Sequence, residues 1–116
     1  MEGIHILANL YGCENKKILL DEILLEREIK RLIKKSGLEI VGKCFYKFKG
    51  AGVTGTFIIS ESHVSVHTWP EKNNSINLDI FTCNFSENNE NKTKGLFKDL
   101  KELFSPKKIK SKIVRR

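Results

Sequence analysis

The spacing of apolar and polar residues changes several times along the 116-residue chain. Six short segments, mostly β-branched or partly alternating, predict strands at residues 4–10, 38–48, 56–60, 63–69, 76–82 and 108–114. Two longer segments, 16–36 and the stretch around 96–104, repeat apolar residues at the spacing of amphipathic helices. The predicted order is therefore β-α-β-β-β-β-α-β, with no internal linker.

The ends of the two helices can also be predicted. Asn15 is positioned to cap the first helix, and Gly37 after two lysines is a typical stop. Within that helix we expect Leu19, Ile23, Leu25, Ile29, Leu32 and Ile33 to line the buried side. Pro106 should end the second helix, whose apolar side carries Leu96, Phe97, Leu100, Leu103 and Phe104.

Hairpin-connected strands with only two helices favour an α+β fold. We expect a two-layer sandwich in which an antiparallel sheet carries two helices on one face, leaving the other face for a partner or a site. The length favours a single domain over 1–116.

Composition narrows the class of protein. No apolar run approaches the ~18–20 residues that a membrane span needs, and the first residues lack the features of a signal peptide. The cysteines Cys13, Cys44 and Cys83 are odd in number and widely spaced, which argues against a disulfide framework. We therefore expect a cytoplasmic protein without a membrane partner.

The net charge of +7 is unevenly distributed. Residues 1–91 carry a balance of −1, whereas residues 92–116 carry +8. A basic end can bind nucleic acid, but no aromatic residues alternate with these lysines to stack on bases. A solvated helix and tail is the preferred interpretation, with nucleic acid not expected as a partner.

Two motifs are only weak evidence for a functional site. Residues 50–55 match G-x-G-x-x-G, but a β-branched strand rather than a helix follows, so a glycine-rich hairpin is the better interpretation. His63 and His67 share a strand face and could bind zinc with Cys83. The absence of CxxC, HExxH or an evident carboxylate partner argues against a metal.

Residues 60–71 are the most informative stretch, with two histidines, a tryptophan, two carboxylates and several hydroxyls. The block 61–71 (ESHVSVHTWPE), followed by 79–83 (DIFTC), closely resembles bacterial and archaeal S-adenosylmethionine decarboxylase proenzymes. Lys47-Phe48 and 52–55 (GVTG) match the same pattern upstream.

The resemblance implies a cofactor made from the chain itself. The hydroxyl of Ser62 would attack the carbonyl of Glu61, and elimination from the resulting ester followed by hydrolysis would convert Ser62 into a pyruvoyl group. The single domain would then consist of two intertwined chains, 1–61 and 62–116. The substrate amine would form a Schiff base with the pyruvoyl ketone, which accepts electrons as CO2 leaves.

The same resemblance assigns the other roles. His67 matches the processing base, Thr54 a hydroxyl that supports processing, and Cys83 the general acid that reprotonates the product. Phe48, Trp69 and Glu71 match substrate-binding residues, with aromatic faces toward adenine and the carboxylate toward the ribose hydroxyls. The processed unit would form a homodimer with its sites at the interface.

The predicted function is therefore decarboxylation of S-adenosylmethionine to supply aminopropyl groups for spermidine and polyamine synthesis. Tyr46, the loop 49–51 and Asn84 depart from the common pattern. A pyruvoyl-dependent arginine or ornithine decarboxylase on this scaffold is the first alternative. A binding module of the same fold that has lost processing is the second.

Overall fold

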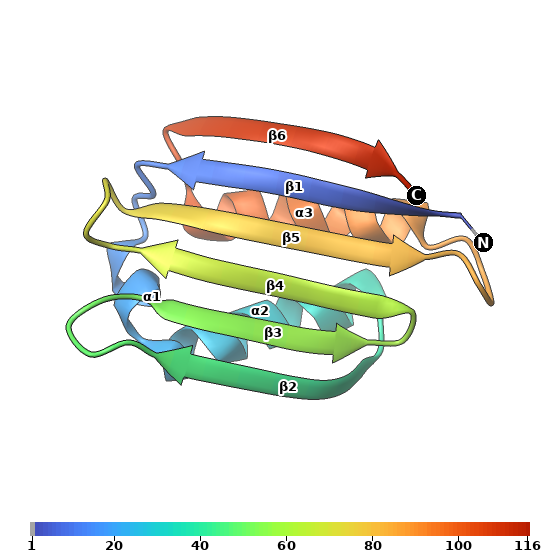
Figure 1. Cartoon of the computed structure of the whole chain (residues 1–116), viewed down its shortest axis with the longest axis horizontal. Helices are drawn as coiled ribbons and strands as arrows, with labels where there is room; N and C mark the ends of the chain where they lie inside the picture. Colours follow the sequence, from blue (N-terminus) through green and yellow to red (C-terminus); the bar gives the residue numbers. More distant parts are fainter. Residues whose placement is uncertain (1) are drawn as a thin grey trace.

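Six strands form one antiparallel sheet in the computed structural model, which describes residues 2–116. The strand order is β2-β3-β4-β5-β1-β6, and the helices cover one face (Figure 1). The elements are β1 (Gly3–Tyr11), α1 (Lys16–Leu20), α2 (Glu22–Ser36), β2 (Ile40–Lys47), β3 (Val53–Ile59), β4 (Ser62–Trp69), β5 (Ser75–Cys83), α3 (Glu90–Phe104) and β6 (Lys108–Arg115). The predicted α+β sandwich is confirmed, and β2 and β6 are its edge strands.

The first predicted helix is wrong in one respect, because it is broken at Asp21 into α1 and α2. Asp21 has an extended backbone, and its carboxylate accepts hydrogen bonds from the main-chain N–H groups of Ile23 and Leu24. It is therefore the N-cap that starts a new helix. The break changes the helical phase, so Ile23 lies on the outer side and is 75% exposed. The predicted capping by Asn15 is also wrong, since its side chain instead donates to the carbonyl of Leu103.

The core lies between the helices and the covered face of the sheet. Alternate residues of the strands point inward, as the period of two requires, and the buried sides of α2 and α3 pack against them. Its largest fully buried side chains include Phe57, Phe104, Ile6, Leu10, Leu25, Ile29 and Leu78. Phe97 and Leu103 pack against this core while partly exposed, so the predicted apolar side of the second helix is confirmed.

The glycine-rich motif forms the hairpin between β2 and β3, as expected. A Cβ on Gly52 would lie only 1.9 Å from the carbonyl oxygen of Thr68. Glycine is therefore needed because the neighbouring backbone approaches closely.

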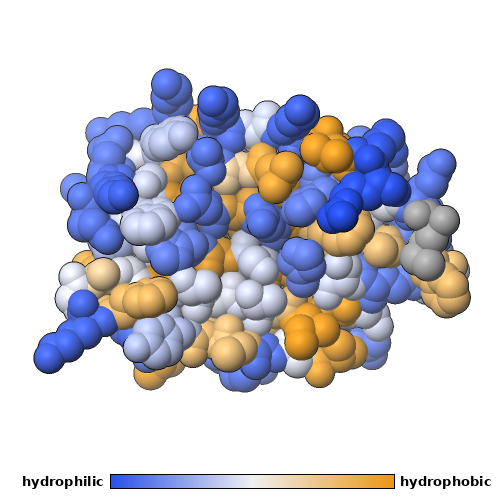
Figure 2. Space-filling view, in the orientation of Figure 1, coloured by the Kyte–Doolittle hydropathy of each residue, from blue (hydrophilic) through white to orange (hydrophobic). Residues whose placement is uncertain are grey.

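The opposite face of the sheet is not covered by helices. Figure 2 shows this face, where apolar patches lie among polar side chains. Exposed apolar residues such as Leu7, Phe48 and Ile58 contribute to it. We call this surface the open face.

Candidate active site

The turn between β3 and β4 holds two residues in an unusual backbone conformation. Glu61 has φ 69° and Ser62 has φ 133°, and neither is glycine. Residues other than glycine rarely adopt such φ values, and each such residue costs on the order of 1–3 kcal/mol. The peptide bond that joins these two residues is therefore flanked on both sides by strained backbone.

The carbonyl group of that peptide is directly hydrogen-bonded. The main-chain N–H of Cys83 donates to the carbonyl oxygen of Glu61 at 2.9 Å. Ser62 lies opposite Thr82 in the β4–β5 ladder. Ser62 and the half-buried Cys83 therefore lie at the same end of the sheet.

The hydroxyl of Ser62 contacts a histidine that follows it directly. Its Oγ lies 3.1 Å from Nδ1 of His63. The His63 ring packs beside Phe81 and His5, with ring centroids 6.0 Å and 6.1 Å away. His63 can therefore exchange a proton with the Ser62 hydroxyl, a contact that the sequence alone did not predict.

His5 is the least satisfied polar group near this end. Its Nε2 is buried and has no hydrogen-bond partner among the described residues. Burial is the main cause that lowers the pKa of His5 below its ordinary value of 6.5, although the nearby Asp79 carboxylate acts in the opposite direction. A neutral ring is therefore favoured at this position.

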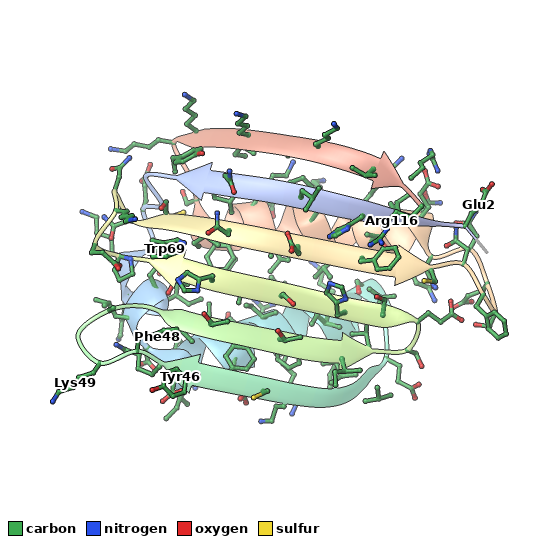
Figure 3. The ribbon with its side chains drawn as sticks, viewed as in Figure 1. Glu2, Tyr46, Phe48, Lys49, Trp69 and Arg116 are labelled. Atoms are coloured by element: carbon green, nitrogen blue, oxygen red, sulfur yellow. The ribbon has the colours of Figure 1, made fainter. Side chains whose placement is uncertain are left out.

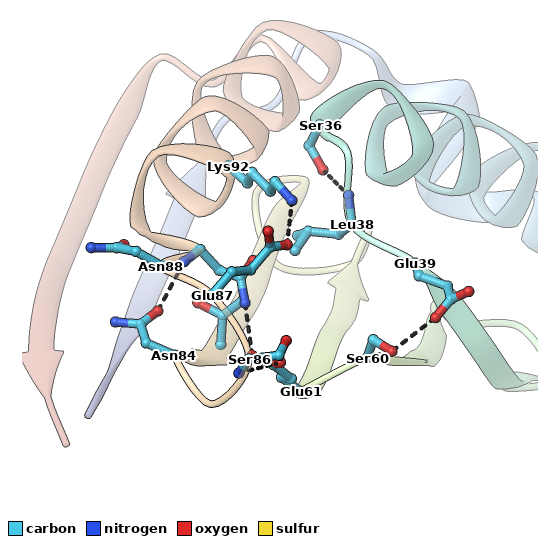
Figure 4. Close-up of polar contacts among 12 residues, drawn as sticks. Ser36, Leu38, Glu39, Ser60, Glu61, Asn84, Ser86, Glu87, Asn88 and Lys92 are labelled. Carbon is cyan, nitrogen blue, oxygen red and sulfur yellow. Dashed lines mark hydrogen bonds and ion pairs between the residues drawn. The ribbon is translucent and has the colours of Figure 1, made fainter. Parts of the chain in front are cut away.

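The carboxylate of Glu61 is held by the loop between β5 and α3 (Figure 4). It accepts hydrogen bonds from the main-chain N–H groups of Phe85 and Ser86, from the Ser86 hydroxyl, and from the Asn89 amide. These bonds, led by that of the Ser86 hydroxyl, lower the pKa of Glu61. The side chain preceding the strained peptide is thus fixed in place.

A second group of predicted residues lies at the other end of the open face (Figure 3). The Thr54 hydroxyl is hydrogen-bonded to Nδ1 of His67. The His67 ring packs between Trp69 and Phe48, with centroid distances of 4.0 Å and 5.8 Å. Glu71 is exposed in the turn that follows β4. A histidine and aromatic faces therefore come together here.

These two ends are far apart within one chain. His67 follows Ser62 by five residues on the same strand, which corresponds to ~16 Å at the usual rise of about 3.3 Å per residue. A general base must lie within about 2.6–3.2 Å of its target, or one water away. His67 of the same chain therefore cannot act directly on Ser62.

The metal hypothesis finds no support in the structure. Across residues 2–116, no three histidine, cysteine, aspartate or glutamate side chains are grouped closely enough to hold an ion. In that same part of the chain, no helix has the length and apolarity to cross a membrane.

Comparison with known proteins identifies the family. A family model described as S-adenosylmethionine decarboxylase matches residues 4–116. The chain belongs to the S-adenosylmethionine decarboxylase family. The predicted resemblance is therefore confirmed over nearly the whole sequence.

Individual relatives agree with this assignment. The S-adenosylmethionine decarboxylase proenzyme of Archaeoglobus fulgidus is 38% identical over 114 residues, covering 98% of this chain and 96% of the relative. The proenzyme of Clostridium tetani is 47% identical over 81 residues, covering 70% of this chain and 63% of the relative. The crystal structure of adenosylmethionine decarboxylase from Aquifex aeolicus matches with a TM-score of 0.85 at 27% identity, covering 97% of this chain and 88% of that one.

Two residues that contact the turn between β3 and β4 are not indicated by the sequence alone. The sequence suggests His63 only as a metal ligand, because its contact with Ser62 depends on the strained turn. Asn89 was part of a polar loop with no motif of its own. The only available signal was the density of asparagines between 84 and 91, which does not indicate what each side chain contacts.

Proposed function

We propose that this protein is a self-processing decarboxylase that acts on S-adenosylmethionine and supplies aminopropyl groups for polyamine synthesis. The single observation that carries the proposal is the peptide between Glu61 and Ser62. It lies between two positive-φ residues, and its carbonyl accepts a hydrogen bond from Cys83. The family and the names of the relatives supply the substrate class.

The first step is an attack by the Ser62 hydroxyl on the carbonyl carbon of Glu61. A new C–O bond forms, the C–N bond breaks, and the hydroxyl proton moves to the released amine. The developing negative charge on the Glu61 oxygen is stabilised by the Cys83 N–H, in the manner of an oxyanion hole. Because the strain at both residues is relieved, this step is more favourable here than the same attack on an unstrained peptide bond.

The second step is removal of the Ser62 α-proton and elimination of the Glu61 carboxylate, which ends chain 1–61. The resulting dehydroalanine tautomerises to an imine, and water hydrolyses this imine, so that ammonia leaves and a pyruvoyl group remains at the start of chain 62–116. This cofactor supplies a ketone that binds the substrate amine and withdraws electrons as CO2 leaves. The residues fit the group, because Ser62 begins β4 and the Cys83 thiol belongs to the strand paired with it.

His67 acts on Ser62 in this proposal from a second copy of the chain. A two-fold dimer in which two open faces meet with reversed ends would bring the Ser62 end of one copy over the His67 end of the other. Each of the two sites would then contain Glu61, Ser62 and Cys83 of one copy with Thr54 and His67 of its partner. The distance along β4 and the exposed apolar residues of the open face support this arrangement.

The aromatic end would hold the adenosine part of the substrate. Phe48 and Trp69 flank His67 with their ring faces, and flat aromatic surfaces suit stacking on adenine. Glu71, exposed beside them, would accept hydrogen bonds from the ribose hydroxyls. Retention of all three residues favours S-adenosylmethionine over arginine or ornithine.

The two chains would remain together after cleavage. Chain 1–61 contributes β1, β2 and β3, and chain 62–116 contributes β4, β5 and β6. Because β1 lies between β5 and β6 in the sheet, the fragments share both hydrogen bonds and core.

The three cysteines form no disulfide, which is in keeping with the proposed cytoplasmic location.

Mass spectrometry of the purified protein under denaturing conditions tests this function. We expect two masses that divide between Glu61 and Ser62, with a ketone on the downstream fragment that reacts with phenylhydrazine. The Ser62→Ala variant should remain one chain and release no CO2 from carboxyl-labelled S-adenosylmethionine. Persistence of a single unmodified wild-type chain would contradict the proposal and favour the binding module.

A further inference from the structure

Asn89 is a buried polar residue whose side chain is directed toward the strained turn. It is only 3% exposed, and it precedes α3 at the position where asparagine commonly caps a helix. Its side chain makes no capping hydrogen bond. Instead, Nδ2 donates to Oε2 of Glu61 at 2.9 Å and to the carbonyl of Cys83 at 3.0 Å.

These contacts close a ring around the peptide that would be cut. The Cys83 N–H binds the carbonyl of Glu61, the Cys83 carbonyl binds Asn89, and Asn89 binds the Glu61 side chain. One amide group thus connects the residue that supplies the attacked carbonyl with the residue that binds its oxygen. Among the described residues, no other side chain is hydrogen-bonded to both Glu61 and Cys83.

Asn89 is itself rigidly held. Its N–H donates to Oδ1 of Asn84 at 2.9 Å, and its carbonyl accepts from the N–H and hydroxyl of Thr93. The Thr93 hydroxyl is also 2.7 Å from that of Thr82, in the buried layer between α3 and β5. The Asn89 amide is therefore fixed to the helix layer as well as to the sheet.

We propose that Asn89 is a positioning residue for self-cleavage, which aligns the Glu61 carbonyl with both the Cys83 N–H and the Ser62 hydroxyl. The inference rests on the proposed function and deepens it. Asn89 does not exchange a proton with the reacting atoms. It acts through Glu61 and Cys83 and limits their movement while the ester forms.

The chemistry of the first step explains why such alignment matters. Ester formation requires Ser62 Oγ to approach the carbonyl carbon while the N–H of Cys83 remains on the carbonyl oxygen. A misplacement of about 1 Å can reduce the rate of an enzymatic reaction by about 100-fold. We therefore expect Asn89→Ala to slow cleavage by about 10- to 100-fold.

The charge of Glu61 distinguishes two substitutions at this site. The amide of Asn89 donates to the Glu61 carboxylate, whereas an aspartate would place a second negative charge against it. Asn89→Asp should therefore slow cleavage more than Asn89→Ala. A role in filling space alone would predict the reverse, because aspartate is closer in size to asparagine.

The experiment follows the first-order cleavage of freshly translated chains by gel electrophoresis. It compares wild type, Asn89→Ala, Asn89→Asp, Glu61→Ala and the double variant of Glu61 and Asn89. Asn91→Ala is the matched control, because Asn91 is exposed on the same helix and should cleave at the wild-type rate. The effects of Glu61→Ala and Asn89→Ala on the activation free energy of cleavage should be less than additive, because the two substitutions remove the same hydrogen bond.

Hydroxylamine identifies the step that Asn89 affects, because it cuts an ester at Glu61 far faster than a peptide bond. A His67→Ala chain, blocked at elimination, should be cut at Glu61 by hydroxylamine. Asn89→Ala should resist it, because its ester forms slowly. Wild-type cleavage in Asn89→Ala, or rapid cutting of that variant by hydroxylamine, would overturn the inference. Failure of the wild type itself to cleave would instead overturn the proposed function and the inference together.

Discussion

Co-expression of the Ser62→Ala and His67→Ala variants should restore a chain cleavage that neither variant carries out alone. Ser62→Ala lacks the hydroxyl that is proposed to attack Glu61, and His67→Ala lacks the base that is proposed to remove the α-proton. In a mixed dimer of the proposed arrangement, one of the two sites would combine the intact Ser62 of one copy with the intact His67 of the other. That site is complete, whereas the second site lacks both residues.

The expected effect follows from the separation of the two residues along β4. Five residues at about 3.3 Å each place them ~16 Å apart, several times the reach of a hydrogen bond. A base in the same chain would have to cross this distance along a strand that is paired on both sides, by β3 and β5. Partner exchange is the simpler route for a symmetric dimer.

The assay uses different affinity tags on the two variants and mass spectrometry of each recovered chain. With equal expression and random pairing, about half of the His67→Ala chains should be cut and no Ser62→Ala chain should be. His67→Ala expressed alone is the control and should remain uncut. Absence of cleavage in verified mixed dimers, or cleavage of His67→Ala alone, would refute the argument that the partner supplies the base.

Three further outcomes follow from the contacts described. The Cys83→Ala chain should still be cut, because the hydrogen bond to Glu61 comes from the main chain of residue 83. Its decarboxylation per cut chain should fall by about 100- to 10,000-fold. An equal loss of chain cleavage and of decarboxylation would contradict this expectation. Leu100→Ala, made in uncut Ser62→Ala chains, should lower the free energy of unfolding in urea by about 2–5 kcal/mol, because Leu100 is fully buried; a change below about 1 kcal/mol would contradict its place in the core. Since the pKa of His5 is lowered in the folded state, its neutral form stabilises the fold above the unfolded value of 6.5, and this contribution is lost as the pH falls through the folded value. His5→Phe in the same uncut chains should therefore reduce the loss of stability between pH 7 and 5, and parallel curves for the two proteins would argue against it.

The sequence by itself determined the layers of this protein and the family to which it belongs. Apolar residues every second position predicted the strands, and apolar residues at helical spacing predicted both helix layers, because these periods follow from local backbone geometry. The block from Glu61 to Glu71, with Cys83, identified the family directly. The prediction of one continuous first helix was wrong at Asp21, because the side chain of this residue, in the middle of a helical pattern, caps a second helix.

Only the tertiary structure decided which of the predicted residues lie together. Ser62, His67 and Cys83 belong to one motif in the sequence, yet strand pairing places Cys83 next to Ser62 and moves His67 to the far end of β4. Asn89 shows the opposite case, since a residue without a motif reaches both Glu61 and Cys83. The physical reason is that a strand separates residues close in sequence by about 3.3 Å per step, whereas neighbouring strands and the loop after them bring distant residues within hydrogen-bond distance.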